Sequence, residues 1–91
     1  NTKVVDIVEE LEDFGCKVDL YDPWASAEVV KHEYGKELIA AIDPDKEYQA
    51  VIACVSHNQF KTFDFKKYKE QGAVIFDVKD FVDRSVVDGR L

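Results

Sequence analysis

The sequence predicts an α/β domain, a Rossmann-like three-layer sandwich in which helices cover both faces of a mainly parallel sheet. Helix-like segments alternate along the chain with short apolar segments, which is the order typical of such domains. Two segments, residues 50–55 and 73–77, have runs of consecutive apolar residues rather than apolar residues at every second position. Continuous apolarity in so short a segment indicates a strand that is covered on both sides. The 91 residues are expected to form one domain, residues 1–91.

Three segments have the pattern of helices. In the first, apolar residues recur three and four positions apart and charged residues cover the other face. The expected helices span residues 2–14, 27–34 and 59–71, the last with a break near residues 62–64. Ser26 is a good N-cap for the second helix. Each helix ends at a glycine that can adopt a left-handed conformation, namely Gly15, Gly35 and Gly72.

Four segments have the pattern of strands, and a mixed tail follows them. The expected strands span residues 17–21, 37–42, 48–55 and 73–77, of which the second has the weakest pattern. Asp22-Pro23 ends the first of them, because proline fixes its own φ and restricts the residue before it. Residues 78–91 have no clear periodicity and are expected to form the tail.

Composition excludes several classes of protein. With 19 acidic and 12 basic residues the net charge is −7, which argues against nucleic acid and anionic membranes as partners. No apolar run approaches the roughly 18 residues of a membrane span, and no basic-then-apolar leader opens the chain. Cys16 and Cys54 form no disulfide framework and have no nearby residues that suggest a thiol nucleophile or a metal site. We therefore expect a reduced, cytoplasmic protein.

Dinucleotide and phosphate loops are missing from the sequence. A dinucleotide site needs closely spaced glycines between a strand and a helix, and the four glycines of this chain are each isolated. The chain therefore offers no NAD site of its own and no P-loop.

Several single residues admit a functional and a structural interpretation. Asp22 and Asp77 fall at the carboxyl ends of strands, and with Lys79 they suggest a phospho-acceptor receiver domain, but the acidic pair of such a domain is missing. The structural alternative is that Asp22 caps the turn before Pro23 and that Asp77 ends its strand.

Three more residues stay open in the same way. His57 could touch a ligand at the carboxyl edge of the sheet or cap a turn, and His32 is expected to be solvated. Trp24 could fill a core or subunit contact, or stack on a base.

Five segments together resemble a known family. They are NTKVVD (residues 1–6), GCKVDLYDPW (15–24), VSHNQF (55–60), VIFDVK (74–79) and VDGRL (87–91). The chain resembles, over nearly its whole length, the C-terminal UDP-binding domain of the UDP-glucose/GDP-mannose dehydrogenase family. Within that family it looks most like the bacterial UDP-N-acetyl-hexosamine 6-dehydrogenases of the Vi-polysaccharide and O-antigen type.

The resemblance implies a function that the chain performs only as part of a longer enzyme. Family members oxidise the C6 hydroxyl of a UDP-sugar to a carboxylate with two NAD molecules. They bind NAD mainly through an N-terminal domain and carry the catalytic cysteine in a middle region, so neither Cys16 nor Cys54 inherits that role. The chain alone is expected to be inactive and to contain no catalytic, cofactor-binding or metal-binding residue. Its expected partners are a UDP-sugar, the other domains of the parent enzyme and further copies of that enzyme.

Two basic residues are candidates for binding the UDP-sugar. A basic residue just after the strand that matches residues 74–77 reaches the nucleotide-sugar in the family, and Lys79 stands there in this chain. Many relatives have arginine at that position, and lysine keeps the charge without the bidentate grip on phosphate. Arg90 is the weaker candidate. The alternative is that each is a solvated charge.

The resemblance also raises a question about the sheet. The family's first strand precedes its first helix, and here the helix begins at about Thr2, so that strand is expected to be missing. Its neighbours, residues 17–21 and 50–55, would then pair directly or pair with another chain, since unpaired strand edges favour association. Two other functions stay open: a stand-alone receiver-like signalling domain and an oligomerisation module without a ligand.

Overall fold

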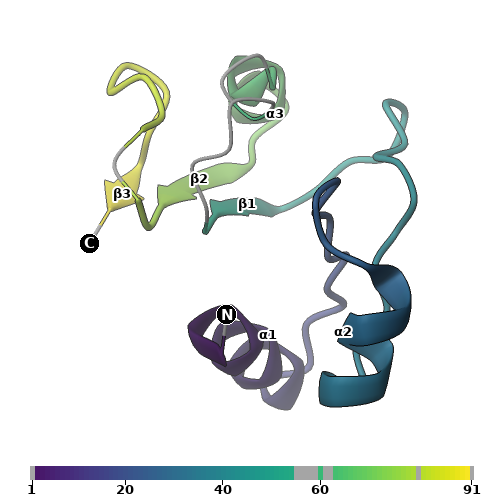
Figure 1. Ribbon diagram of the computed structural model, residues 1–91. Helices are drawn as coiled ribbons and strands as arrows, with labels where there is room; N and C mark the ends of the chain where they lie inside the picture. Colours follow the sequence, from purple (N-terminus) through teal and green to yellow (C-terminus); the bar gives the residue numbers. More distant parts are fainter. Residues whose placement is uncertain (1, 55–59, 61–62, 80, 91) are drawn as a thin grey trace. The chain divides into compact units, whose positions relative to one another are not determined.

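The computed structural model describes residues 2–54, 60, 63–79 and 81–90. The described chain contains helices α1 (Thr2–Asp13), α2 (Ala27–Tyr34) and α3 (Phe65–Glu70), and strands β1 (Ala50–Ala53), β2 (Val74–Asp77) and β3 (Gly89–Arg90) (Figure 1). The chain divides into two compact units, Asn1–Pro44 and Asp45–Leu91, called here the N-terminal unit and the C-terminal unit.

Both helices of the N-terminal unit follow their sequence signals. After α1, Gly15 has φ 88°, its N–H donates to the carbonyl of Glu12 at 2.9 Å, and the Cys16 N–H donates to Leu11 at 3.0 Å. This pair of bonds is the Schellman motif, which only a left-handed residue allows. At the start of α2 the Ser26 hydroxyl accepts the Val29 N–H at 3.4 Å, as expected of an N-cap.

The two strands expected in this unit are replaced by a single β-bridge. Leu20 and Leu38 form an isolated parallel bridge, and the Ile39 N–H donates to the Leu20 carbonyl at 2.9 Å. The prediction of full strands over residues 17–21 and 37–42 was therefore wrong for the described chain. A strand is stabilised by a row of hydrogen bonds to a neighbour, and here the row is one bridge long.

The C-terminal unit contains the parallel sheet that the sequence predicted. Its order is β1-β2-β3, and both pairings are parallel, with Ala50 opposite Val74 and Ala53 opposite Asp77. The chain passes from β1 to β2 through α3, which lies over one face of the two strands (Figure 1). The three-layer sandwich remains a prediction. The tail was expected to be irregular, but it supplies β3, with Gly89 opposite Phe76.

Helix α3 is shorter than the expected helix over residues 59–71. It begins at Phe65 because the Asp64 carboxylate accepts the Lys67 N–H at 3.1 Å and so caps the first turn. The expected break near residues 62–64 agrees with this start, although residues 59, 61 and 62 lie outside the described chain. The helix ends before Gly72, which has φ 95°.

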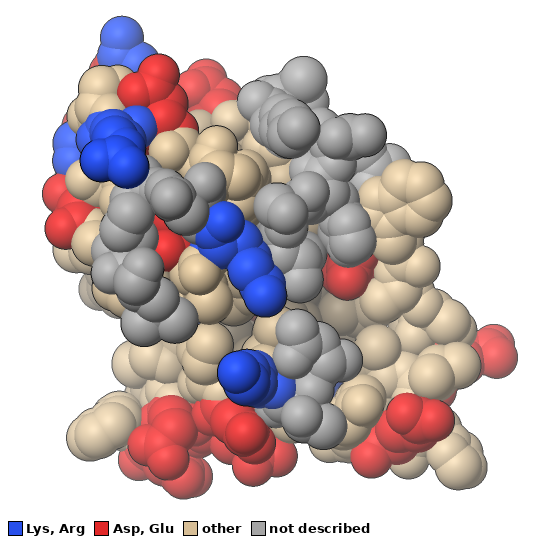
Figure 2. Space-filling model, turned by 60° about the vertical axis from the view of Figure 1, so that its left-hand side comes forward, with Lys and Arg blue, Asp and Glu red and all other residues tan. Residues whose placement is uncertain are grey.

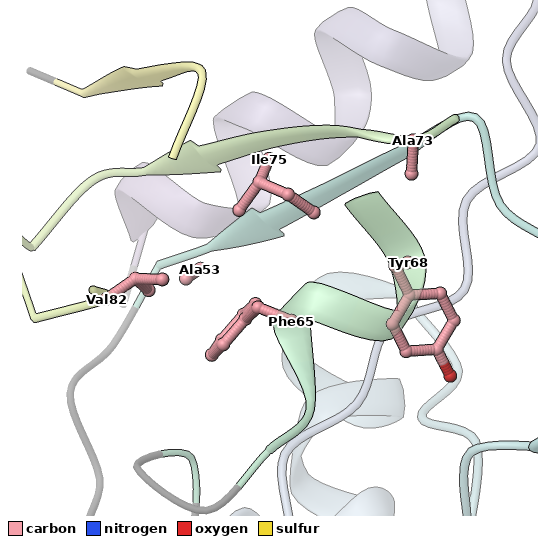
Figure 3. Close-up of a cluster of buried hydrophobic side chains, with 6 residues drawn as sticks. All are labelled: Ala53, Phe65, Tyr68, Ala73, Ile75 and Val82. Carbon is pink, nitrogen blue, oxygen red and sulfur yellow. The ribbon is translucent and has the colours of Figure 1, made fainter. Parts of the chain in front are cut away.

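An apolar cluster between the sheet and α3 forms the core of the C-terminal unit. Ile75, fully buried on β2, points toward the α3 side, where Phe65 and Tyr68 lie (Figure 3). The next side chain on the other side, Val74, is 52% exposed, whereas Ile75 is 0% exposed. The continuous apolar run of β2 therefore does not correspond to a strand whose every side chain is buried in the described structure.

Candidate functional site

The carboxyl end of β2 brings the two basic candidates to one edge of the sheet. Arg90 on β3 lies opposite Asp77, the last residue of β2, and Lys79 follows Asp77 by two positions. Ligands of parallel α/β sheets bind outside the carboxyl ends of the strands. The fold thus places the backbones of Lys79 and Arg90 where a ligand of such a sheet would lie.

Asp77 organises the loop that carries Lys79. Its carboxylate is completely buried and accepts three backbone N–H groups: Lys79 at 3.0 Å, and Phe81 and Val82 at 2.7 Å each. A carboxylate that accepts several backbone donors is stabilised in its buried position. The structural interpretation of Asp77 is therefore confirmed, and a buried carboxylate occupied in this way does not present itself as a phospho-acceptor.

Lys79 itself is exposed, and its ammonium group makes no ion pair with any described residue. It can therefore reach a ligand without first breaking a salt bridge to the described part of the chain. The side chain of Arg90 lies outside the described structure, so only its register is known. Whether either residue binds a ligand stays a prediction.

Asp88 is a residue of this region that sequence reasoning missed. Its Oδ1 accepts the Lys69 ammonium of α3 at 2.8 Å, and its Oδ2 accepts the Ile75 N–H of β2 at 2.8 Å. Its own N–H donates to the Ile75 carbonyl at 2.8 Å. The Lys69 hydrogen bond, with that of Ile75, holds the pKa of the Asp88 carboxyl below its usual range. No local signal in the sequence points to this role, because both side-chain partners of Asp88 lie more than ten positions away.

Gly89 allows β3 to approach β2 closely. A Cβ at this position would lie 2.9 Å from Cδ2 and 3.0 Å from Cε2 of the Phe76 ring, which is closer than such atoms pack. A side chain at residue 89 would therefore require the Phe76 ring to shift if Arg90 is to stay paired with Asp77.

The remaining acidic and aromatic candidates have structural roles or stand exposed. The Asp22 carboxylate accepts the Trp24 N–H at 2.9 Å, so Asp22 caps the turn around Pro23 as the structural interpretation proposed. Trp24 is 67% exposed, so it fills no core in the described chain, and the alternatives of a subunit contact and of stacking on a base stay predictions. His32 is exposed as expected, and His57 lies outside the described residues.

The two cysteines are free thiols. Cys16 is exposed, and Cys54 is half-buried with a pKa raised by that burial, which disfavours the reactive thiolate. The part of the chain that the structure describes contains no group of three or more potential metal ligands. Among the described helices, none has the length and apolar character needed to cross a membrane.

Charge is divided unequally between the two units. Residues 1–44 contain 11 acidic and four basic residues, whereas residues 45–91 contain eight of each. Figure 2 shows acidic side chains gathered over the helices of the N-terminal unit. An anionic ligand is therefore repelled less by the C-terminal unit, which contains Lys79 and Arg90.

Comparisons with known proteins agree on one family. The sequence model of the UDP-glucose/GDP-mannose dehydrogenase family, UDP binding domain, matches residues 1–84. A UDP-N-acetyl-D-glucosamine 6-dehydrogenase of Salmonella typhi is 36% identical over 94 aligned residues, and one of Pseudomonas aeruginosa is 38% identical over 94. Each alignment covers 100% of this chain and 22% of the relative. No solved structure matches the chain significantly.

Proposed function

Because the chain belongs to the UDP-glucose/GDP-mannose dehydrogenase family, we propose that it is the UDP-binding domain of an NAD-dependent UDP-sugar 6-dehydrogenase. The chain spans 22% of the length of the two relatives, so the oxidation itself belongs to the parent enzyme, meaning the full-length protein that contains this chain. The observation that supports the proposal is the position of Lys79 and Arg90 together at the carboxyl end of β2. Two basic residues whose backbones lie at one edge suit a diphosphate.

In this proposal the chain binds the nucleotide and not the reacting carbon. Lys79 donates to a diphosphate oxygen, and the hydrogen bonds of Asp77 to residues 79, 81 and 82 fix the loop from which Lys79 extends. Binding energy from a part of the substrate that does not react then holds the sugar C6 in place for oxidation.

NAD, the oxidant of the proposed reaction, does not fit this chain. A dinucleotide site needs a glycine-rich turn between a strand and a helix, and the glycines here are isolated at residues 15, 35, 72 and 89. Three of them, Gly15, Gly35 and Gly72, have positive φ at the ends of helices. We therefore assign NAD binding to the N-terminal domain of the parent enzyme, and no step of the oxidation to this chain.

The finer features of the proposal follow the same relatives. We propose UDP-N-acetyl-hexosamine as the substrate class, since both relatives carry the name UDP-N-acetyl-D-glucosamine 6-dehydrogenase. We further propose that the parent enzyme is a cytoplasmic homo-oligomer that supplies surface polysaccharide synthesis. The two free cysteines support a reducing compartment.

Replacement of Lys79 tests the proposed site in the parent enzyme. Lys79→Ala removes a charge-assisted hydrogen bond of roughly 1.5–3 kcal/mol, so kcat/KM for the UDP-sugar should fall about 10- to 150-fold. The KM for NAD should not change. Lys66→Ala is the matched control, because Lys66 is an exposed lysine of the same unit that pairs with Glu70 at 3.8 Å. An unchanged kcat/KM in Lys79→Ala would make Lys79 a solvated charge only.

Assays of the isolated chain separate this function from its rivals. The purified 91-residue chain should bind UDP in a calorimetric titration at millimolar concentration and should reduce no NAD with any UDP-sugar. Steady NADH production by the chain would contradict the proposal. Binding of UDP distinguishes the proposal from a ligand-free oligomerisation module, and the buried Asp77 carboxylate already disfavours a receiver domain.

A further inference from the structure

We propose that Asp88 is the positioning residue that holds Arg90 at the diphosphate end of the UDP site. The inference rests on the proposed function, because it presumes that UDP lies at the carboxyl end of β2. It extends that function to a residue that touches α3 and β2, and that would act on the nucleotide only through Arg90.

The need for a positioning residue follows from the size of β3. The strand is two residues long and makes one parallel pairing, in which Gly89 lies opposite Phe76 and Arg90 opposite Asp77. So few backbone hydrogen bonds give little stability against the conformational entropy that is lost when the segment is ordered. Without a further contact, β3 would separate from β2 readily and Arg90 would leave the edge.

Asp88 supplies that contact immediately before the strand begins. Its N–H and its Oδ2 engage the carbonyl and the N–H of the same residue, Ile75, each at 2.8 Å. Ile75 is completely buried in the core, so the packing of its side chain holds the residue to which Asp88 is bonded. Two bonds to one fixed residue set both the position and the direction of the chain as it enters Gly89 and Arg90.

The second carboxylate oxygen ties the same point to α3. Asp88 Oδ1 accepts the Lys69 ammonium at 2.8 Å, and Lys69 lies in the last turn of α3. The ion pair also offsets a negative charge two residues from Arg90, which a diphosphate would otherwise meet as repulsion. A carboxylate is needed for both functions, since each of its oxygens accepts from a different donor. An asparagine could accept from Ile75, but its amide nitrogen would face the Lys69 ammonium.

A double-mutant cycle in the parent enzyme tests whether Asp88 acts through Arg90. Asp88→Asn should weaken UDP binding about 5- to 30-fold and raise the KM for the UDP-sugar by a similar factor. The kcat and the KM for NAD should stay the same, which general destabilisation would not produce. Arg90→Ala should weaken UDP binding at least as much. In the Arg90→Ala background, Asp88→Asn should have no further effect, since the arginine it positions is gone.

Two further variants keep the result interpretable. Asp83→Asn is the matched control, because the Asp83 carboxylate accepts only the N–H and hydroxyl of Ser85, at 2.9 and 2.8 Å, within its own turn among the described contacts. It should leave UDP affinity unchanged. Lys69→Gln removes the ion pair and keeps the Ile75 bonds, so it should reproduce part of the Asp88→Asn effect even where the Asp88 variant folds poorly.

The possible failures point to different conclusions. Two results would overturn the positioning role. One is a loss of UDP affinity in the double variant that equals the product of the losses in Asp88→Asn and Arg90→Ala. The other is an unchanged UDP affinity in Asp88→Asn. An unchanged affinity in Arg90→Ala with a loss in Lys79→Ala would also overturn it and would leave the proposed function in place. A parent enzyme that binds no UDP would overturn the proposed function and this inference together.

Discussion

Residues 1–44 and residues 45–91 are nearly equal in length, but they become ordered through different interactions. In the N-terminal unit the described helices end at local signals, and the two expected strands meet at the single bridge between Leu20 and Leu38. In the C-terminal unit three parallel strands and α3 enclose a buried apolar cluster. The difference indicates that local signals set where the helices of the first unit end, whereas pairing between distant residues forms the sheet of the second.

The two units also differ in charge, and the difference bears on function. All of the net charge of −7 comes from residues 1–44, because residues 45–91 contain equal numbers of acidic and basic residues. In the C-terminal unit the carboxylates of Asp77 and Asp88 are occupied by backbone and lysine donors. The proposed anion site therefore lies in the unit that has no net charge and in which the two nearby carboxylates, those of Asp77 and Asp88, already accept hydrogen bonds.

The largest effect is expected from a pair of isoleucine substitutions, one in each unit. Ile75→Ala should lower the free energy of unfolding of the C-terminal unit by about 2–5 kcal/mol, because it leaves a cavity at a completely buried site. Ile39→Ala is the counterpart in the N-terminal unit, where Ile39 is half-buried, and its loss should be clearly smaller. Urea denaturation followed by hydrogen exchange of each unit measures both. Equal losses would show that the two units have comparable cores.

The next largest effect is expected at two glycines, Gly89 and Gly15, which are needed for different structural reasons. Gly89→Ala should cost about 1–3 kcal/mol, because its Cβ would overlap the Phe76 ring. Gly15→Ala should cost about 1–2 kcal/mol for a different reason, since its φ of 88° is left-handed and its surroundings are open. Thermal denaturation of the two variants gives the stability, and UDP affinity separates them further: only Gly89→Ala should weaken binding. Equal UDP affinities would contradict the close packing proposed for β3.

The fold was predictable where the signals lie within a few residues of each other. Gly15 predicted the end of α1, and Ser26 and Gly35 predicted both bounds of α2, to within one residue, because capping depends on local hydrogen bonds. Strand length was not predictable in the same way, since a strand extends only as far as its neighbour does. The segments around Leu20 and Leu38 have strand composition but pair at one residue each.

The candidate site was predictable only in part. Lys79 and Arg90 came from the family resemblance, and nothing in their spacing of 11 positions indicates that both reach the end of β2. Their proximity depends on β3, whose two residues are too few to show a periodicity. Asp88 could not be assigned a role from sequence, because its two side-chain partners, Lys69 and Ile75, lie 19 and 13 positions away.

A smaller effect on the free energy of unfolding is expected at acid pH in one unit and at alkaline pH in the other. The pKa of Asp88 is lowered by its bonds to Lys69 and Ile75, so its contribution to stability is present above about pH 3.9 and is lost as the pH falls through the lowered value. The pKa of Lys36 is raised by the Glu12 hydrogen bond at 2.8 Å. Its contribution is therefore present below about pH 10.4 and is lost as the pH rises through the raised value.

Variants of these two residues should reduce the pH dependence of the free energy of unfolding, one at acid pH and the other at alkaline pH. Asp88→Asn should reduce the acid loss of the C-terminal unit, and Lys36→Gln should reduce the alkaline loss of the N-terminal unit. Circular dichroism follows the whole chain, and the fluorescence of Trp24, the one tryptophan in the sequence, reports on the N-terminal unit. If Lys36→Gln instead removed the loss of stability at acid pH, the assignment of the acid effect to Asp88 in the C-terminal unit would be wrong.

The smallest effect is expected at Trp24. Its side chain is 67% exposed, so Trp24→Ser should change the free energy of unfolding by less than about 0.5 kcal/mol. Asp22→Ala is the control within the same turn, and it should cost more, because the Asp22 carboxylate accepts the Trp24 N–H at 2.9 Å. Acrylamide should quench Trp24 fluorescence efficiently at low protein concentration. The contrary result is quenching that falls as the protein concentration rises, together with association in sedimentation that Trp24→Ser abolishes. Trp24 would then lie in a contact between copies of the chain, and the small change in the free energy of unfolding would apply to the monomer only.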